Sequence, residues 1–188
     1  ESAGINQFWP EGRGIFFNNN KTFLTWINEE DQLRIISMEQ GANIKSVFGR
    51  LQKAVAAINE KLEFAYNEQL GYLTACPTNI GCGERASVHI KVPLTSQNKE
   101  AFDDIAKRNN LQIRGVHGEH SESKGGVYDV SNKRRLGITE WDGIKDLING
   151  CKELIESETQ LQKEQGIEEK EDGNPASVEE AYEKAKNN

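Results

Sequence analysis

Cysteine, methionine and proline are scarce in this chain of 188 residues, which contains three, one and four of them, respectively. The three cysteines form an odd set without CxxC spacing, which argues against a disulfide framework and against a zinc site. No apolar run approaches the length of a membrane span. A basic excess is also absent, since the formal net charge is -7. This charge disfavours a surface that tracks the phosphates of nucleic acids.

The motifs of common nucleotide-binding and secreted proteins are missing as well. No strand is followed by GxGxxG and a helix, so the common Rossmann site has no support, and there is no internal repeat. The first residues have neither the basic start nor the apolar core of a secretory signal. We therefore expect a cytoplasmic protein with reduced thiols. Any nucleotide site in it should differ from the Rossmann type.

The chain does contain enough apolar sequence for one core, followed by a polar tail. Hydrophobic residues make up 36% of the chain and charged residues 28%, which fits a globular protein. Residues 163–188 contain eight acidic residues and four lysines, so they carry more than half of the net charge. We predict one domain over residues 1–165 and a tail over 166–188, in which an acidic linker leads to a short helix starting at Ser177.

Hydrophobic periodicity predicts a mixture of strands and helices. Three segments have the composition and alternation of strands: 21–28, 33–38 and 111–114. Three others place apolar residues at helical spacing: 47–62, 99–109 and 144–155. The predicted class is α+β, with a large, mostly antiparallel sheet flanked by helices.

The most informative segment runs from a cysteine to an alternating strand. The run Cys76-Pro77-Thr78-Asn79 leads through a glycine-rich turn to Arg85 and residues 86–93. Because the side chains of a strand alternate between two faces, the apolar residues of this segment share one face and the polar residues share the other. The polar set consists of Arg85, Ser87, His89 and Lys91. A thiol therefore precedes a polar, partly cationic face of a sheet.

Four motifs occur together in the chain: residues 28–31 (NEED), 33–38 (LRIISM), 76–79 (CPTN) and 125–132 (GGVYDVSN). With these motifs the chain resembles the phosphagen (ATP:guanidino) kinases, and most closely the arginine kinases, from about Phe8 to about Glu158. The resemblance implies the phosphagen kinase / glutamine synthetase-like catalytic fold, a large antiparallel sheet flanked by helices. Family members usually carry a small helical N-terminal domain ahead of this one, and that domain is an implied partner.

The resemblance implies reversible transfer of the ATP γ-phosphoryl group to a guanidino substrate, most closely L-arginine, which buffers ATP. Mg²⁺ would accompany ATP or ADP and be held through the nucleotide phosphates, with no metal ligand from the protein. By the same resemblance, the catalytic and substrate-binding residues are Glu30, Cys76 and Glu119. The two carboxylates would fix the guanidinium through forked hydrogen bonds, and the thiolate of Cys76, stabilised by Thr78, would tune its charge. Creatine kinases generally carry an apolar residue in place of Glu119, so arginine is favoured over creatine.

The resemblance also implies a set of nucleotide-binding residues: Arg34, Arg85, His89, Arg114, Gly115 and Asp129. The three arginines would offset negative charge on the nucleotide and on the transferred phosphoryl group. His89 would line the adenine and ribose region together with Asp129, which is expected in the loop of Gly125 and Gly126. The two glycines would permit a close approach of the backbone.

Taken singly, these residues have simpler interpretations. A lone glutamate such as Glu30 usually solvates a turn, and isolated arginines usually form surface salt bridges. Cys76 can be a buried, inert thiol, and His89 can be a structural histidine. We assign the inert role to Cys82 and Cys151.

Two features leave a second function open. Glu84 places a carboxylate beside Arg85, where it would weaken nucleotide binding if it pointed inward. In addition, the resemblance covers only the catalytic part of a typical member. The alternative is a non-catalytic nucleotide-binding or scaffold module whose acidic tail docks on a partner. The oligomeric state stays open.

Overall fold

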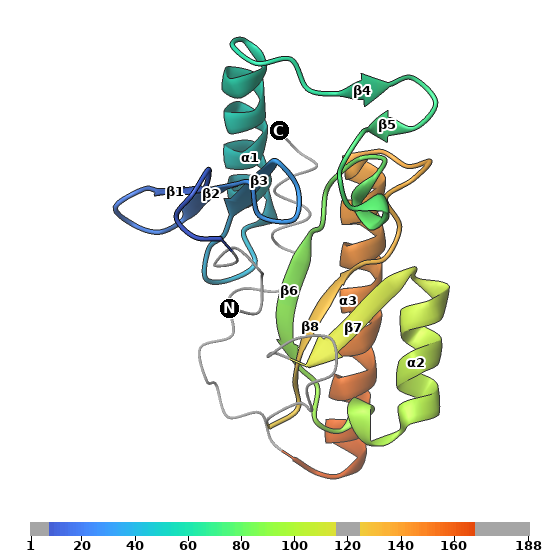
Figure 1. Ribbon diagram of the computed structural model, residues 1–188. Helices are drawn as coiled ribbons and strands as arrows, with labels where there is room; N and C mark the ends of the chain where they lie inside the picture. The colour runs from blue at the N-terminus through green and yellow to red at the C-terminus, as the bar shows by residue number, and fades with distance from the viewer. Residues whose placement is uncertain (1–7, 116–124, 168–188) are drawn as a thin grey trace. The chain divides into compact units, whose positions relative to one another are not determined.

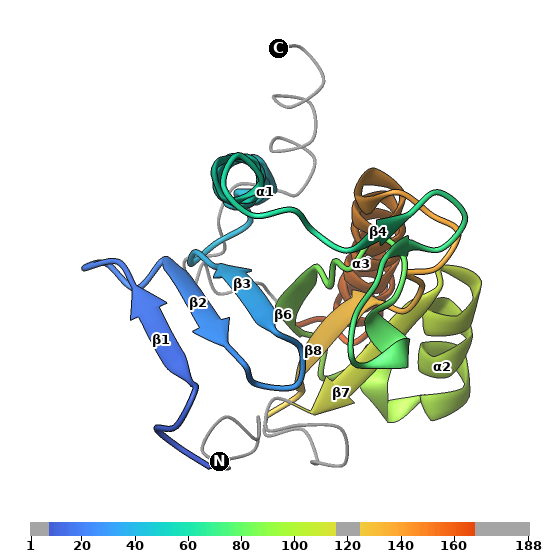
Figure 2. The same ribbon diagram turned by 45° about the horizontal axis from the view of Figure 1, so that its top comes forward.

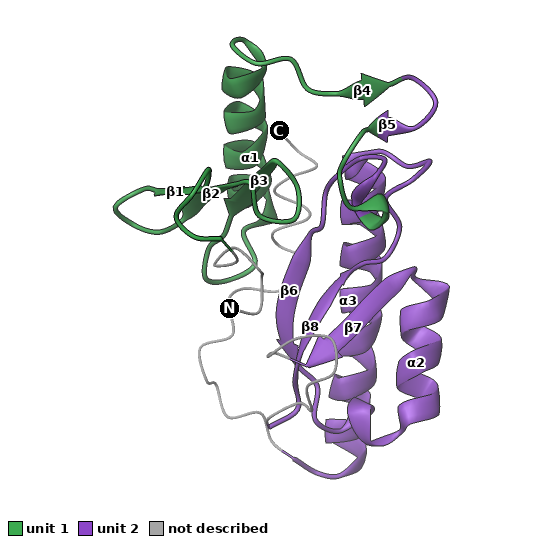
Figure 3. Cartoon of the chain, in the orientation of Figure 1, with its two compact units in different colours: residues 1–67, 72–78, 172–188 green, residues 68–71, 79–171 purple. Residues whose placement is uncertain are grey.

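The computed structural model describes residues 8–115 and 125–167, and Figure 1 shows the order of their helices and strands. The chain divides into two compact units, which Figure 3 colours separately. Unit 1 comprises residues 1–67, 72–78 and 172–188, and unit 2 comprises residues 68–71 and 79–171. Nearly all of the predicted tail lies outside the described residues, so the division into a domain over 1–165 and a tail over 166–188 stays a prediction.

Unit 1 is built on a three-stranded antiparallel sheet. Its strands, paired in chain order, are β1 (Gly14–Phe17), β2 (Phe23–Ile27) and β3 (Leu33–Ser37). Helix α1 (Ile44–Asn59) packs beside β3 and is seen nearly end-on in Figure 2. The side chain of Asn43 accepts a hydrogen bond from the Ser46 amide and caps the start of this helix. The two strands and the helix predicted in this region are confirmed.

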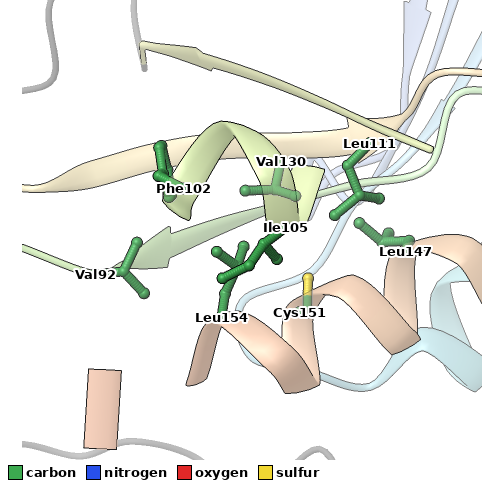
Figure 4. Close-up of a cluster of buried hydrophobic side chains, with 8 residues drawn as sticks. All are labelled: Val92, Phe102, Ile105, Leu111, Val130, Leu147, Cys151 and Leu154. Carbon is green, nitrogen blue, oxygen red and sulfur yellow. The ribbon is translucent and has the colours of Figure 1, made fainter. Parts of the chain in front are cut away.

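Unit 2 combines a second antiparallel sheet with two helices. Its strands, in the spatial order β6-β8-β7, are β6 (Ser87–Lys91), β8 (Val127–Asn132) and β7 (Leu111–Gly115). Helices α2 (Lys99–Arg108) and α3 (Glu140–Glu164) pack against this sheet. Figure 4 shows the cluster of buried side chains that joins these elements: Val92, Phe102, Ile105, Leu111, Val130, Leu147, Cys151 and Leu154.

Strand β6 confirms the predicted alternation. Val88 and Ile90 are half-buried and pack against the core of unit 2. The polar residues Ser87, His89 and Lys91 are exposed. Burial of the apolar face holds the sheet against the helices, which leaves its polar face as the surface available for binding.

Helix α3 begins earlier and runs further than the apolar spacing over residues 144–155 predicted. Thr139 and Asp142 form a capping box at its start. The Thr139 side chain accepts a hydrogen bond from the Asp142 amide, and the Asp142 carboxylate accepts one from the Thr139 amide. Among the helices of the described residues, none has both the length and the apolar character needed to cross a membrane.

The predicted fold class, α+β with antiparallel strands, is confirmed. The extent of the sheet differs from the expected single large sheet. The described strands form three sheets, of three, two and three strands, and the smallest is the hairpin of β4 (Tyr66–Asn67) and β5 (Gly71–Tyr72). Periodicity identifies a strand and its buried face but not the neighbours of that strand, which is why the division was not predicted.

Candidate active site

The turn between β2 and β3 carries a cluster of opposite charges in unit 1. Arg34 Nη2 lies 3.1 Å from Glu29 Oε2 and 3.4 Å from Glu30 Oε2. The guanidinium also lies over the ring of Trp26, 5.6 Å from its centroid, because Trp26 and Arg34 are paired directly across the two strands. The Glu29 side chain is 3% exposed, whereas that of Glu30 is 49% exposed. Glu30 is therefore the more accessible carboxylate of this ion-pair cluster.

The cysteine loop is attached to the same turn. The amide of Cys76 donates a hydrogen bond to Asp31 Oδ1 at 2.9 Å, and Asp31 directly follows Glu30. The thiol of Cys76 lies 3.0 Å from Thr78 Oγ1 and is half-buried. The Thr74 hydroxyl donates to the carbonyl of Cys76. Unit 1 thus brings the predicted thiol to the predicted acidic turn, and the thiol is not fully buried as an inert cysteine would be.

Three residues of this arrangement were not predicted from the sequence: Trp26, Glu29 and Asp31. The acidic run was visible in the sequence, but acidic residues in a turn are ordinarily solvated. Tertiary contacts show instead that Glu29 is a buried ion-pair partner and that Asp31 accepts a backbone hydrogen bond.

In unit 2 the polar face of the sheet brings four predicted nucleotide-binding residues together. β8 lies between β6 and β7 (Figure 1), and it pairs Asp129 with His89 on one side and with Arg114 on the other. Directly paired residues point to the same face of an antiparallel sheet. Arg85, which precedes β6, reaches the same row, since its Nη2 donates to Asp129 Oδ2 at 2.6 Å. We call these four residues, Arg85, His89, Arg114 and Asp129, the cross-strand row.

Asp129 lies at the centre of the cross-strand row. The expectation that it belongs to a glycine-rich loop is wrong, because Asp129 lies within β8, which is paired with β6 and with β7. Its neighbours Tyr128 and Val130 pack on the core and hold this strand in place. The Oδ1 atom of Asp129 is buried and has no hydrogen-bond partner among the described residues. A buried carboxylate oxygen without a donor is costly. Asp129 is therefore placed to accept a hydrogen bond from a ligand.

The other predicted residue of unit 2 that the structure describes is Gly115, the last residue of β7. Arg114 Nη2 donates to Gln112 Oε1 at 2.8 Å, and Gly115 is buried opposite Tyr128. Glu119 belongs to residues 116–124, which lie outside the described residues. The role of Glu119 thus stays a prediction. His89 is exposed on β6, and this position does not fit a histidine buried in the core.

Gly126 makes a close approach to protein. Its φ is 74°, and a Cβ atom at this position would lie 2.6 Å from the Cα of Pro93. Its carbonyl accepts a hydrogen bond from the Val92 amide at 2.9 Å. Glycine therefore lets the turn before β8 pack against the chain after β6. The observed reason for this glycine is packing, whereas the predicted approach to a ligand is untested.

The other two thiols fit the inert role. Burial raises the pKa of Cys151 to about 12, and burial also raises the pKa of Cys82. A thiol with a raised pKa is protonated at neutral pH and is a poor nucleophile. Neither cysteine has the half-exposed position of Cys76.

Glu84 differs from an ordinary surface carboxylate. Burial, with a smaller contribution from the negative charge of Glu140, raises the pKa of Glu84 to about 7. Arg85 forms its ion pair with Asp129 and not with Glu84. The carboxylate therefore changes its charge near neutral pH, next in sequence to a residue of the cross-strand row.

We expect Glu84→Gln to change the pH dependence of stability. The pKa of Glu84 in the folded state, about 7, lies above its ordinary value of 4.5, so the folded state holds an extra proton between these pH values. Protonated Glu84 makes its full contribution to the free energy of unfolding below about pH 4.5, and this contribution is lost as the pH rises to about 7. At pH 8, Glu84→Gln should be more stable than wild type by about 2 kcal/mol, a value reduced for partial exposure, and the two should converge at low pH.

Urea unfolding of both proteins between pH 4.5 and 8 measures this difference. Glu156→Gln is the matched control, because Glu156 is an exposed carboxylate of α3 in the same unit. It should keep the wild-type pH dependence. A stability difference between Glu84→Gln and wild type that stays constant with pH would contradict the raised pKa.

The described residues contain no group of three or more His, Cys, Asp or Glu side chains that could hold a metal ion. The cross-strand row instead offers guanidinium groups, whose fixed donors match phosphate and carboxylate oxygens. In unit 1 the acidic turn and the cysteine loop offer acceptors suited to a cationic group. Unit 2 thus carries residues suited to an anionic group, and unit 1 carries residues suited to a cationic one.

The fold is that of a guanidino-phosphotransferase catalytic domain. The chain matches the ATP:guanido phosphotransferase family, C-terminal catalytic domain, over residues 2–161, and it belongs to this family. The resemblance inferred from the four sequence motifs is confirmed.

Similar proteins include several arginine kinases. The chain is 56% identical to the arginine kinase of Anthopleura japonica over 161 residues, which covers 84% of this chain and 22% of that protein. It is 52% identical to the arginine kinase of Turbo cornutus over 167 residues, which covers 88% of this chain and 46% of that protein. The chain thus spans less than half the length of these curated relatives.

Two solved structures have a similar fold. Lombricine kinase superposes with a TM-score of 0.79 at 44% sequence identity, covering 90% of this chain and 47% of that chain. The duplicated taurocyamine kinase of Schistosoma mansoni with bound transition state analog components superposes with a TM-score of 0.76 at 47% identity, covering 85% of this chain and 22% of that chain. Both support the α+β catalytic fold.

Proposed function

We propose that this domain takes part in the reversible transfer of a phosphoryl group between ATP and a guanidino substrate, with L-arginine as that substrate. The observation that supports the proposal most is the cross-strand row, in which Arg85 and Arg114 flank Asp129 on one sheet face. Guanidinium groups bind phosphates, and an unpartnered carboxylate oxygen can accept a hydrogen bond from a ribose hydroxyl. The similarity to arginine kinases, together with the predicted role of Glu119, favours arginine.

In the proposed mechanism Glu30 and Glu119 hold the substrate guanidinium. This group is protonated at physiological pH, so it must be aligned with the γ-phosphoryl group and lose a proton as it attacks. A carboxylate can both fix its direction through forked hydrogen bonds and accept the proton. The exposed position of Glu30 supports this assignment.

Cys76 is proposed to tune the charge and position of the guanidinium without forming a covalent bond. The hydroxyl of Thr78, 3.0 Å from the thiol sulfur, can donate a hydrogen bond to a thiolate. The hydrogen bond from the Cys76 amide to Asp31 fixes the loop that carries the thiol. The negative charge would therefore be presented from a defined place.

The arginines are proposed to bind the nucleotide. Arg34, Arg85 and Arg114 would offset charge on its phosphates and on the transferred group, and His89 and Asp129 would contact the base and ribose. Mg²⁺, which the family implies, would be held through the nucleotide phosphates, and the guanidinium donors of the cross-strand row fit the oxygens of those phosphates. When bound, Mg²⁺ neutralises phosphate charge.

We further propose that full activity needs an N-terminal domain. The arginine kinase relatives extend well beyond the region matched by this chain. In the family that domain supplies additional arginines for the phosphates and the loop that contacts the guanidino substrate. This chain alone is therefore expected to turn over slowly or not at all.

The test is a coupled assay of ATP formation from ADP and phosphoarginine, with and without a separately produced N-terminal domain of a family member. Activity in either arm supports the proposal. A folded protein that is silent in both arms contradicts it and favours the non-catalytic nucleotide-binding or scaffold module. Calorimetry of ADP binding then separates these outcomes further. Together with ADP, arginine and nitrate resemble the transition state, so they should tighten ADP binding to a catalytic site. They should not tighten ADP binding to a simple nucleotide-binding module.

A further inference from the structure

Arg85 lies beyond the regular strand pairing of its sheet. The ladder between β6 and β8 ends where Ser87 pairs with Ser131. Glu84 and Ala86, the residues on either side of Arg85, precede this point. Their partly buried backbone groups need partners that the ladder does not supply.

Asn132 supplies these partners. Its Oδ1 accepts a hydrogen bond from the Ala86 amide at 2.9 Å, and its Nδ2 donates to the Glu84 carbonyl at 3.2 Å and to the Arg134 carbonyl at 2.9 Å. Its own amide donates to the Ala86 carbonyl at 3.3 Å. The residue is 1% exposed. The Ala86 amide is a donor and the two carbonyls are acceptors, so only one orientation of the Asn132 side-chain amide satisfies all three partners.

Strand β8 therefore holds Arg85 in two ways. Asp129 pairs with the guanidinium, while Asn132 holds the backbone on both sides of the residue. Positions separated by three in a strand lie on opposite faces, so Asn132 is on the face that carries the core. Gly143 of α3 leaves room for it there, because a Cβ atom at that glycine would lie 3.0 Å from Asn132 Nδ2.

We propose that Asn132 is a positioning residue for the nucleotide site: it fixes the backbone around Arg85 and thereby the point from which the guanidinium reaches the phosphates. The inference rests on the proposed function. A guanidinium on a fixed backbone loses less freedom on binding than one on a mobile loop. Aspartate cannot replace Asn132, since it has no N–H donors for the two carbonyls, and the side chains of alanine and serine are too short to span all three partners.

The test is calorimetric titration of this chain with ADP and Mg²⁺. Four proteins are compared: wild type, Asn132→Ala, Arg85→Ala and the double variant. Asn132→Ala should weaken ADP binding about tenfold, because a small displacement of a positioned group is costly. In the Arg85→Ala background the same change should cause no further loss, which separates positioning of Arg85 from general loosening of the sheet.

Asn109→Ala is the matched control. Asn109 is a partly buried asparagine of the same unit whose Nδ2 donates to the Ile105 carbonyl at 3.0 Å and to Glu153 at 2.5 Å, and to no residue of the cross-strand row. It should lose stability in urea without a change in ADP affinity. If Asn132→Ala does not fold, Gly143→Ala replaces it, because this change crowds the amide and keeps every hydrogen-bonding group. It should weaken ADP binding about threefold.

The outcomes are distinguishable from those of the proposed function. A folded wild-type chain that binds no ADP, either alone or with the separately produced N-terminal domain, overturns both proposals. A wild type that binds ADP and is weakened by Arg85→Ala, but not by Asn132→Ala or Gly143→Ala, overturns only the positioning role. Equal losses from Asn132→Ala with and without Arg85 overturn it as well, since they indicate an effect that does not act through Arg85.

Discussion

Replacing Cys76 by alanine is expected to lower the rate of ATP formation by about 10²–10³-fold in the coupled assay, in whichever arm the wild type is active. The change removes the proposed negative charge beside the substrate guanidinium. It leaves the loop in place, because the bond to Asp31 is made by the backbone amide of Cys76 and not by its side chain. The loss should therefore appear in the rate while the unfolding transition stays near that of wild type.

Two further variants test whether the loss of activity in Cys76→Ala comes from the loss of this particular thiolate. Cys82→Ala should keep wild-type activity within about twofold, since the raised pKa of Cys82 leaves it protonated and without a catalytic role. Cys76→Ser keeps a hydroxyl that can bond to Thr78 but cannot supply the proposed thiolate, so it should also be strongly impaired. A serine variant as active as wild type would show that a thiolate is not needed.

Replacing Glu158 by alanine is expected to destabilise unit 2 by about 3 kcal/mol. Glu158 is 5% exposed. Its two carboxylate oxygens accept hydrogen bonds from the amides of Leu94 and Thr95 at 2.7 to 3.1 Å. These amides lie at the start of the 3-10 turn η2 (Thr95–Gln97), which leads from β6 to α2. Without the carboxylate, buried donors lose their charged acceptor, and the link between α3 and this turn is broken.

Urea unfolding followed by circular dichroism measures the effect of Glu158→Ala. Glu156→Ala is the matched control on the same helix and should change the free energy of unfolding by less than about 0.5 kcal/mol, because Glu156 is exposed. Glu158→Gln should recover part of the loss, since one acceptor oxygen remains. Equal stability of Glu158→Ala and Glu156→Ala would mean that the buried carboxylate does not hold η2 in place.

The secondary structure was largely predictable because local patterns report it. Alternation over residues 86–93 identified both β6 and its buried face, and helical spacing identified the helices. The boundaries of α3 and the division of the strands among three sheets were not predicted. Strand pairing depends on residues far apart in the chain, whereas hydrophobic periodicity describes only neighbouring residues and does not say which strands pair.

The candidate site was predictable as a set of residue types but not as an arrangement. The motifs singled out Arg85, His89, Arg114 and Asp129, yet their meeting in one row depends on the register that places Asp129 opposite both His89 and Arg114. Asp129 was expected in a loop because glycines precede it, and the regular pairing of β8 shows otherwise. The signal for a strand lay in the high β propensity of Val127, Tyr128 and Val130.

The amino-acid sequence by itself determined the α+β class through its local periodicity. Its motifs, which resemble those of the phosphagen kinases, determined the family and pointed to the thiol, carboxylates and arginines that the proposed chemistry uses. Only the tertiary structure decided which of these groups share a surface and what holds them there. Asp31 anchors the cysteine loop, and Asn132 holds the backbone around Arg85, through hydrogen bonds between segments 45 to 48 residues apart. Such contacts form only when the folded chain buries their polar groups together, and a buried polar group must then find its partner wherever the fold supplies one.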